Sequence, residues 1–253
     1  MDGPARLASE RPLHKRGALV VFAVGADFAW IAAHIPALSA IGLADGDPRF
    51  YLAYQIGRCA IAAVAVGVAL RSGLFGRREL GFVGARHGAA LCTLLRVVGI
   101  IALFGAVLVC AALFIAPSAT CELARRELSP VVYPWEMFVR HLLCMVAVAP
   151  VYEELMYRAL LLSALRDRLG EQQALFVGGA AFVALHYAYG YGWRLGYLAS
   201  GLVFGLVFMR TRSIVAAVAL HALNNFWVVL DWQVRATDDA APILGWLCSP
   251  GPP

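Results

Sequence analysis

Residues 150–158 read Pro150-Val-Tyr-Glu153-Glu154-Leu-Met-Tyr-Arg158 and lie within a mainly apolar run, 137–165. Charged side chains are costly in the hydrocarbon core of a membrane, so their presence in such a run indicates a functional site. On a helix, Glu154 and Arg158 are four residues apart, in the order that favours an ion pair. Glu153 lies about 100° further round the helix, with no partner expected in its own segment. The spacing therefore predicts one neutralised carboxylate and one that is available for chemistry.

Pro150 lies one turn before the two glutamates and has no backbone N–H to donate to the carbonyl of Val146. A helix that continues through this position loses a hydrogen bond there. The sequence therefore predicts a kink or a loosened turn immediately before the glutamates.

The composition is that of a membrane protein. Of the 253 residues, 61% are hydrophobic and 15% are charged, whereas a soluble domain usually carries about 25% charged residues. The net charge of +5 would also suit nucleic acid, but the basic residues are spread over short loops without aromatic side chains beside them. This distribution is typical of membrane topology, so we expect the lipid bilayer as a partner and no nucleic acid.

The apolar segments predict an all-α fold, a polytopic membrane helical bundle of about seven transmembrane helices, or about eight at most. The spans are expected at 17–43, 50–70, 88–117, 137–165, 173–190, 193–209 and 213–232. In the sixth span, Gly201 and Gly205 form a face of small residues that allows close helix packing.

These spans form a single membrane domain, 1–253. Its parts are a cytoplasmic tail at 1–16, three N-terminal spans within 17–117, a core of four spans at 136–232 and a tail at 233–253. Residues 71–87 predict an interfacial loop or a short amphipathic helix, and 118–136 form the longest hydrophilic connection.

The distribution of basic residues predicts the orientation in the membrane. Most of them fall on the side of the N-terminus, and the opposite side holds Arg49, Arg125, Arg126, Arg194 and Arg235. The N-terminus is therefore expected inside, and the arginine-rich composition with a single lysine suggests a bacterial inner membrane. Seven spans then place the C-terminus outside.

The six cysteines show no CxxC spacing, so the sequence indicates neither a metal knuckle nor a disulfide framework. Cys121 and Cys248 are both expected on the outer side, where an oxidising compartment allows a disulfide between them. Free thiols at both positions are the expectation, and the disulfide is the alternative.

Two further polar groups interrupt the later spans. The fifth span contains Phe182-Val-Ala-Leu-His186 and the seventh contains His221-Ala-Leu-Asn224-Asn225. From the helical rise, Glu153 and His186 each lie roughly 20 Å from the inner end of their span, and His221 lies roughly 12 Å from it. Three spans thus place polar groups at overlapping depths, which predicts one shared site.

These residue types suit the hydrolysis of an amide by water. A carboxylate in an apolar cavity can act as general base toward a water molecule, and a histidine beside it can orient that water or carry the proton. A second histidine and an amide can donate hydrogen bonds to a developing oxyanion. The sequence pairs no serine or cysteine with a base, so direct attack by water is expected rather than an acyl-enzyme.

The motifs Glu153-Glu154-x-x-x-Arg158, Phe182-x-x-x-His186 and His221-x-x-x-Asn225, in this order on separate spans, resemble those of the CPBP family. This family comprises CAAX prenyl endopeptidases of the Ras-converting type and bacterial bacteriocin-processing or immunity relatives, the Abi-like proteins. The resemblance covers about the second half of the chain, roughly 136–232, and nothing in residues 1–135 is diagnostic.

The resemblance implies an intramembrane endopeptidase whose site opens to the cytoplasmic side and acts on a membrane protein or peptide. It implies that Glu153 activates water with His186, while His221 and Asn225 stabilise the oxyanion. The supporting positions are Glu154, Arg158, Asn224 and Phe182. Family members are described both as glutamate proteases and as metalloproteases. A zinc ion held by His186, His221 and either Glu153 or Glu154 is thus an alternative, although no HExxH helix is present.

Several structural interpretations stand beside this one. The glutamates can form an ion-paired cluster that holds spans together, and both histidines can be purely structural. Asn225 can bridge helices, which would leave Asn224 as the partner of His221. Three arginines within spans are expected to snorkel or to pair internally, namely Arg58, Arg96 and Arg140. Asp27 is one possible partner for Arg96. The aromatic residues Tyr187, Tyr189, Tyr191, Trp193 and Tyr197 predict an interfacial belt or, alternatively, a substrate gate.

Two other classes of function remain open. A non-catalytic immunity or scaffold protein would use the same fold without hydrolysis. A proton-coupled transporter would also place carboxylates and histidines within the membrane, but the two halves of the chain show no clear repeat. As substrate, a bacterial peptide precursor or the C-terminal sorting segment of an exported protein is expected rather than a prenylated CAAX protein.

Overall fold

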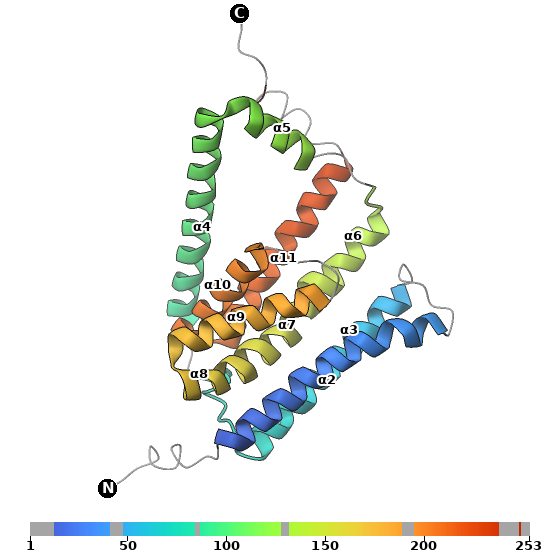
Figure 1. Cartoon of the computed structure of the whole chain (residues 1–253), viewed down its shortest axis with the longest axis vertical. Helices are drawn as coiled ribbons and strands as arrows, with labels where there is room; N and C mark the ends of the chain where they lie inside the picture. Colours follow the sequence, from blue (N-terminus) through green and yellow to red (C-terminus); the bar gives the residue numbers. More distant parts are fainter. Residues whose placement is uncertain are drawn as a thin grey trace, which may run out of the picture.

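The computed structural model describes residues 13–40, 48–83, 87–127, 132–188, 195–237 and 248. All regular secondary structure in these ranges is helical, so the predicted all-α fold is confirmed. Helices α2 (Leu13–Ala40) and α3 (Pro48–Arg71) form an antiparallel pair along one side of the molecule (Figure 1). Most of the predicted aromatic belt, residues 189–193, lies outside the described ranges.

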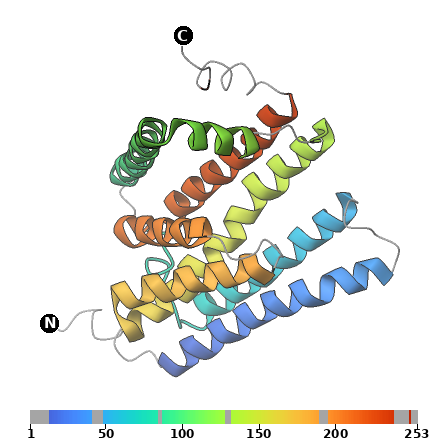
Figure 2. The same cartoon turned by 45° about the horizontal axis from the view of Figure 1, so that its top comes forward.

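The remaining elements form the rest of the bundle. They are α4 (His87–Ile115), α5 (Pro117–Glu127), α6 (Trp135–His141), η1 (Leu142–Val148), α7 (Ala149–Glu154), η2 (Leu155–Leu162), α8 (Ser163–Leu169), α9 (Glu171–Ala188), α10 (Leu195–Thr211) and α11 (Ile214–Ala236). The segments from α6 to α8 follow one another as a single long helix, and α9 returns along it (Figure 2). Within this long helix η1 and η2 are π-helical, so their turns are wider than those of an α-helix.

Within the described residues, five helical segments are long and apolar enough to cross a membrane, which supports a polytopic helical bundle. They are Leu13–His34, Tyr51–Arg71, Cys92–Ile115, Trp135–Leu169 and Ile214–Ala236. The predicted spans 173–190 and 193–209 coincide with α9 and α10, and the apolar part of α10 is shorter. The total of seven spans therefore stays a prediction.

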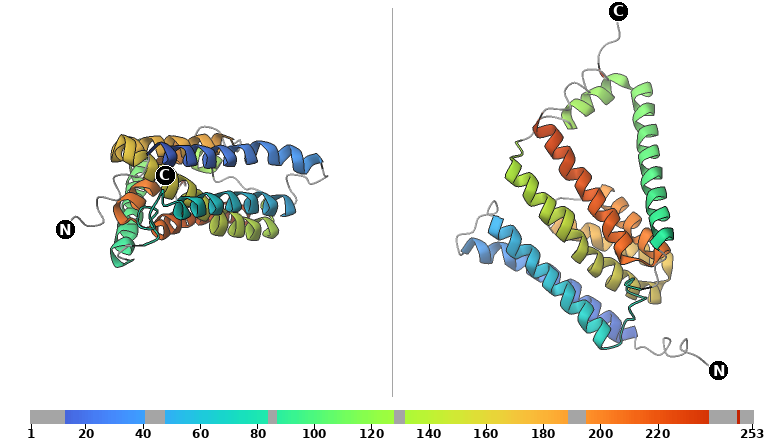
Figure 3. Two further views of the ribbon diagram at one scale, coloured as in Figure 1. Left: turned by 90° about the horizontal axis from the view of Figure 1, so that it is seen from below. Right: turned by 180° about the vertical axis from the view of Figure 1, so that it is seen from behind.

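Helix α4 stands apart from the other long helices over most of its length (Figure 3), and it contacts α10 and α11. Helix α5 follows it and packs against it. None of the most apolar stretch of α4 is buried within the protein, which suits a helix that faces lipid. Helix α5 itself falls in the connection 118–136, whose polar composition had not indicated a helix.

The segment between α3 and α4 is a series of turns in its described part, 72–83, rather than an amphipathic helix. Phe75 and Leu80 in this segment are buried. Gly81 has a φ of +78°, a conformation that favours glycine, and a Cβ there would lie 2.8 Å from the backbone nitrogen of Ile214. Because the Gly81 carbonyl accepts a hydrogen bond from that same nitrogen at 3.1 Å, the turns are fixed to the start of α11.

Arg16 ties three elements together at the same end of the bundle. Its guanidinium donates to Glu79 at 2.9 Å and also pairs with Asp167, so α2, the 72–83 turns and α8 are joined.

Helices α9 and α10 pack closely through the expected face of small residues, since a Cβ on Gly201 would lie 3.3 Å from the Cα of Gly179. The face of small residues on α10 therefore allows α9 and α10 to pack closely.

Cys121, on α5, and Cys248 are joined by a disulfide, so the pairing that the sequence allowed is present and the expectation of free thiols at these two positions is wrong. The bond connects positions separated by 127 residues, so it closes the whole of the predicted core, 136–232, into one loop.

This bond gives a direct chemical test. We expect four cysteines of the denatured, unreduced protein to react with a maleimide, because Cys59, Cys92, Cys110 and Cys144 are free. Reduction should make all six reactive, counted by the mass of the intact protein. The Cys121→Ser variant is the matched control, since it should release Cys248 and react without reduction at one further position. Full labelling of the unreduced parent would contradict the pairing.

Candidate active site

The two glutamates of α7 meet side chains from helices that are distant in sequence. Helix α7 contacts α3 and α11, while α9 lies against η2 and α10 (Figure 2). Both Glu153 and Glu154 are buried, at 5% and 0% exposed, so neither faces lipid or solvent. A site built around them is therefore inside the bundle.

Glu154 is the centre of a buried network. Arg158 donates from Nη1 to Glu154 Oε1 at 2.8 Å, which confirms the predicted ion pair, and from Nη2 to the carbonyl of Gly201 at 3.2 Å. Nδ1 of His221 lies 2.8 Å from the same Glu154 oxygen. Because an ionised carboxylate only accepts, Nδ1 of His221 carries the proton, which leaves Nε2 as the acceptor of the neutral ring.

Phe182 supports this network from α9. Its ring lies under the guanidinium of Arg158, whose central carbon is 4.4 Å from the ring centroid. The same ring is 4.4 Å from the ring of His186 and 5.7 Å from the ring of His221, measured between centroids. Phe182 thus separates Arg158 from water and brings the two histidines to one region of the bundle.

The two carboxylate oxygens of Glu153 have different surroundings. Its Oε1 lies 3.3 Å from the hydroxyl of Tyr152 and 3.6 Å from Nη1 of Arg58. Its Oε2 lies 3.8 Å from Nε2 of His221. The expectation that Glu153 lacks a partner in its own segment is therefore wrong, because the neighbouring tyrosine folds back onto it and α3 adds an arginine.

Arg58 is anchored from the other side by Asp27. Nε and Nη2 of Arg58 donate to the two oxygens of Asp27, each at 2.7 Å, in a bidentate pair. The suggested pair of Asp27 with Arg96 is wrong, because Asp27 faces α3 across the α2–α3 contact whereas Arg96 is exposed on α4. Arg58 therefore pairs inside the bundle, which confirms the second of the two expectations for it, snorkelling or internal pairing.

His186 is fixed by its own helix. Its Nδ1 donates to the carbonyl of Phe182 at 2.8 Å, since a carbonyl only accepts, and Nε2 is therefore the acceptor of the neutral ring. The ring stacks on Tyr197 of α10 at 4.4 Å between centroids. His186 is also close enough to Glu153 and His221 to interact with both electrostatically.

The helix immediately before the glutamates is widened into the π-helical segment η1, which confirms the predicted disturbance at Pro150. Asn225 lies beside this segment. In the π-helical turn, Ala149 donates to the carbonyl of Cys144, and Pro150 has no N–H with which to reach the carbonyl of Met145. The side-chain nitrogen of Asn225 donates to that Met145 carbonyl at 2.8 Å. Asn225 therefore bridges α11 and η1, as the structural interpretation had it.

Asn224 is exposed and donates to Oδ1 of Asn225 at 3.3 Å. In the described part of the chain, the contacts of these two amides are with each other and with Met145, and none of them involves His221. One N–H of the Asn225 amide is left for another acceptor, because an amide nitrogen carries two.

The candidate zinc ligands were His186, His221 and one of the two glutamates. Among the described residues, no group of three or more histidine, cysteine, aspartate or glutamate side chains is arranged to hold a metal ion.

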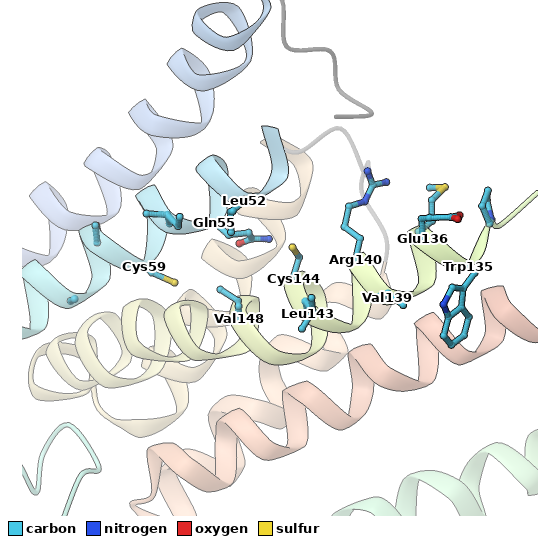
Figure 4. A pocket seen from close by; sticks show the side chains of 15 residues that line it. Leu52, Gln55, Cys59, Trp135, Glu136, Val139, Arg140, Leu143, Cys144 and Val148 are labelled. Atoms are coloured by element: carbon cyan, nitrogen blue, oxygen red, sulfur yellow. The ribbon is translucent and has the colours of Figure 1, made fainter. Parts of the chain in front are cut away.

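A groove of about 1340 Å³ runs beside the charged residues, between α3 and the segment α6–η1 (Figure 4). Its lining is almost entirely apolar, with Gln55, Glu136 and Arg140 as polar members. Cys59 and Val148 line the groove and are close in sequence to Arg58 and to the glutamates, which are not themselves part of the lining.

Asp27, Arg58 and Tyr152 were not predicted as part of the site. Two signals pointed to the first pair, since each is a charged residue in an apolar span. Which cation would meet which carboxylate depends on how the helices pack, and no spacing in the sequence contains that information.

Residues 135–227 match the model of a family described as Type II CAAX prenyl endopeptidase Rce1-like. No curated protein and no solved structure matches the chain. The matched segment contains the three motifs from Glu153 to Asn225, which confirms the resemblance to the CPBP intramembrane proteases. The match supports an intramembrane endopeptidase of the CAAX type, and α2 to α5 lie outside it.

Proposed function

Given that residues 135–227 match the Rce1-like endopeptidases, we propose that this protein hydrolyses a peptide bond of a membrane-associated protein or peptide, with Glu153 as general base. The observation that carries the proposal is the arrangement of Glu153. One of its oxygens is held by Tyr152 and Arg58, while the other faces Nε2 of His221 at 3.8 Å. That separation is too long for a direct hydrogen bond and suits a water molecule that donates to both acceptors.

In the first step, the water oxygen attacks the carbonyl carbon of the scissile bond as Oε2 of Glu153 takes one of its protons. His221 accepts from the same water through Nε2, and its orientation is set by Glu154. The negative charge that forms on the carbonyl oxygen needs hydrogen-bond donors, and the remaining N–H of Asn225 is one. When the C–N bond breaks, the proton held by Glu153 passes to the leaving nitrogen, which regenerates the carboxylate.

His186 is the second assisting residue in this proposal. Its Nδ1 donates to the Phe182 carbonyl, so Nε2 is the accepting nitrogen of the ring. Because water has two protons and Glu153 takes one, His186 Nε2 serves as an alternative to His221 Nε2 for the second. Stacking on Tyr197 fixes the plane of the ring, so the direction of this acceptor is fixed as well.

The groove between α3 and α6–η1 suggests the class of substrate. The apolar lining suits a peptide that carries an apolar anchor, because such an anchor would fill the groove and bury its apolar surface. We further propose a bacterial inner membrane with the N-terminus inside, since the basic residues favour that orientation and it places the Cys121–Cys248 disulfide on the oxidising side.

The proposal is tested with the full chain reconstituted in liposomes. Two fluorophore–quencher probes are compared, a farnesylated CAAX peptide and a peptide anchored by a single transmembrane helix. We expect the parent to cleave at least one of them, and His186→Ala to lower the rate by about 10²-fold. The cleavage position is read by mass spectrometry.

The matched control for this test is His14→Ala, because His14 is an exposed histidine at the start of α2. It should retain the parental rate. Failure of the parent to cleave either probe would overturn the peptidase and favour a non-catalytic scaffold. Proton flux that is lost in Glu153→Gln liposomes without any cleavage would favour the transporter instead.

A further inference from the structure

We propose that Asp27 and Arg58, on α2 and α3, are positioning residues that orient the general base Glu153 through Tyr152. This inference rests on the proposed function and extends it to helices that lie outside the matched segment 135–227. It assigns to the N-terminal helix pair a role in the reaction itself, beyond support of the fold.

The first step is the geometry of the guanidinium. Arg58 has three donor nitrogens, and two of them, Nε and Nη2, are occupied by the two oxygens of Asp27 at 2.7 Å each. This fork leaves Arg58 a single orientation, because guanidinium and carboxylate are both planar. Nη1 is the nitrogen that remains, and it points from α3 toward α7, where it donates to the hydroxyl of Tyr152 at 2.6 Å.

The second step is the direction of the chain of hydrogen bonds. An arginine can only donate, so the Tyr152 oxygen is the acceptor in its contact with Arg58. The single hydroxyl proton of Tyr152 is then available for Glu153 Oε1, 3.3 Å away. Arg58 Nη1 lies 3.6 Å from the same oxygen, so a positive charge and a hydroxyl donor converge on Oε1.

The third step concerns the second carboxylate oxygen of Glu153, Oε2. With Oε1 held, rotation of the carboxylate is blocked and Oε2 is the oxygen that faces His221. The groups facing Glu153 thus come from α3, α7, α9 and α11, as Arg58, Tyr152, His186 and His221. A carboxylate that is free to turn would present its reacting oxygen only part of the time.

Burial makes the arrangement rigid. Asp27 and Arg58 are each 1% exposed and Tyr152 is 2% exposed, so water does not compete for these contacts. The side chain of Arg58 also stacks on the ring of Tyr152, with the guanidinium carbon 4.1 Å from its centroid. In such a dry setting, ion pairs and hydrogen bonds hold their geometry better than they do at a surface.

The alternative is that Asp27 and Arg58 form a purely structural salt bridge between α2 and α3. Two variants distinguish this structural role from the positioning role. Asp27→Asn/Arg58→Gln removes both charges of the pair together, so neither residue is left as a lone buried charge. Glu153 loses the nearby guanidinium but keeps its contacts with Tyr152 and His221, so the fold should persist. Tyr152→Phe removes only the link to Glu153 and leaves the Asp27–Arg58 pair in place. Both variants are assayed in the liposomes described above, with kcat and KM determined separately for the probe that the parent cleaves.

If the pair positions Glu153, we expect kcat to fall by about 10²-fold in the double variant and by about tenfold in Tyr152→Phe, with KM nearly unchanged. Thermal unfolding in detergent should match the parent in both. Arg58→Lys keeps the charge but loses the fork, so it should recover part of the kcat lost in the double variant. Arg96→Gln, an exposed arginine on α4, is the control and should behave as the parent.

The outcomes separate this inference from the function on which it rests. If the parent cleaves neither probe, the peptidase itself fails and the positioning role fails with it. If the parent cleaves, and both Asp27→Asn/Arg58→Gln and Tyr152→Phe keep the parental kcat, the peptidase stands and the positioning role is overturned. A rise in KM with kcat unchanged would also overturn it, since that result indicates a role in substrate binding.

Discussion

Replacing Glu153 with glutamine is expected to abolish proteolysis while the protein inserts and folds as the parent does. Glutamine has nearly the same shape and can still accept from Tyr152 and Arg58 through its oxygen, so the contacts of Oε1 survive. The other terminal atom becomes an amide nitrogen that cannot take a proton from water. Since general base catalysis contributes about 10²–10⁴-fold, the rate on the reconstituted probe should fall by at least about 10²-fold.

The control for this substitution is Glu122→Gln, because Glu122 is an exposed glutamate on α5, far along the chain from the site. Both variants should give the parental yield and the parental elution volume in detergent. Retention of the full rate by Glu153→Gln would remove the general base from the proposal, and His221 would then be the remaining candidate for proton transfer. Measurement under single-turnover conditions keeps product release from hiding a partial loss of the chemical step.

Replacing Arg158 with methionine is expected to cause the largest loss of stability. Glu154 is fully buried, and Arg158 is its ion-pair partner, at 2.8 Å. Removal of one partner from a buried pair leaves an uncompensated charge, which costs about 3–5 kcal/mol. The Gly201 carbonyl also loses its donor. We expect a clear drop in the midpoint of thermal unfolding in detergent and a lower yield.

Two comparisons show whether the loss comes from the buried charge. Glu154→Gln/Arg158→Met removes both charges and should recover most of the lost stability, because the neutral pair leaves no unpaired ion. Arg166→Met, on the same long helix, breaks a partly exposed contact with Asp167 and should change stability by no more than about 1 kcal/mol. An Arg158→Met protein that unfolds with the parental midpoint would contradict this prediction and show that the contact with His221 is sufficient to stabilise Glu154.

The sequence predicted those parts of the site that depend on a single helix. The i,i+4 spacing of Glu154 and Arg158 predicted their ion pair, and the missing N–H of Pro150 predicted the disturbed turn that the π-helical segment η1 provides. The common depth of the motifs on three spans also predicted that Glu153 and His221 would lie near one another, as they do at 3.8 Å. Each inference needed only the helical repeat and the rise per residue.

The contacts between helices could not be obtained in this way. The partner of Asp27 depends on which faces of α2 and α3 meet, and an apolar span with one charge does not fix that. The use of Asn225 to satisfy the Met145 carbonyl depends on the register between α11 and η1. The roles assigned to Glu153, His186, His221 and Asn225 stay predictions; the printed contacts of Asn225 are with Met145 and Asn224.

The Cys121–Cys248 bond has a practical consequence for work with the isolated protein. It closes residues 121–248 into a covalent ring, and α2 and α3 precede this ring in the chain and pack against it through non-covalent contacts. A purification buffer with dithiothreitol opens the ring, so preparations made with and without thiols are two chemically different molecules. Their specific activities and melting curves can be compared only after the oxidation state of each preparation has been measured.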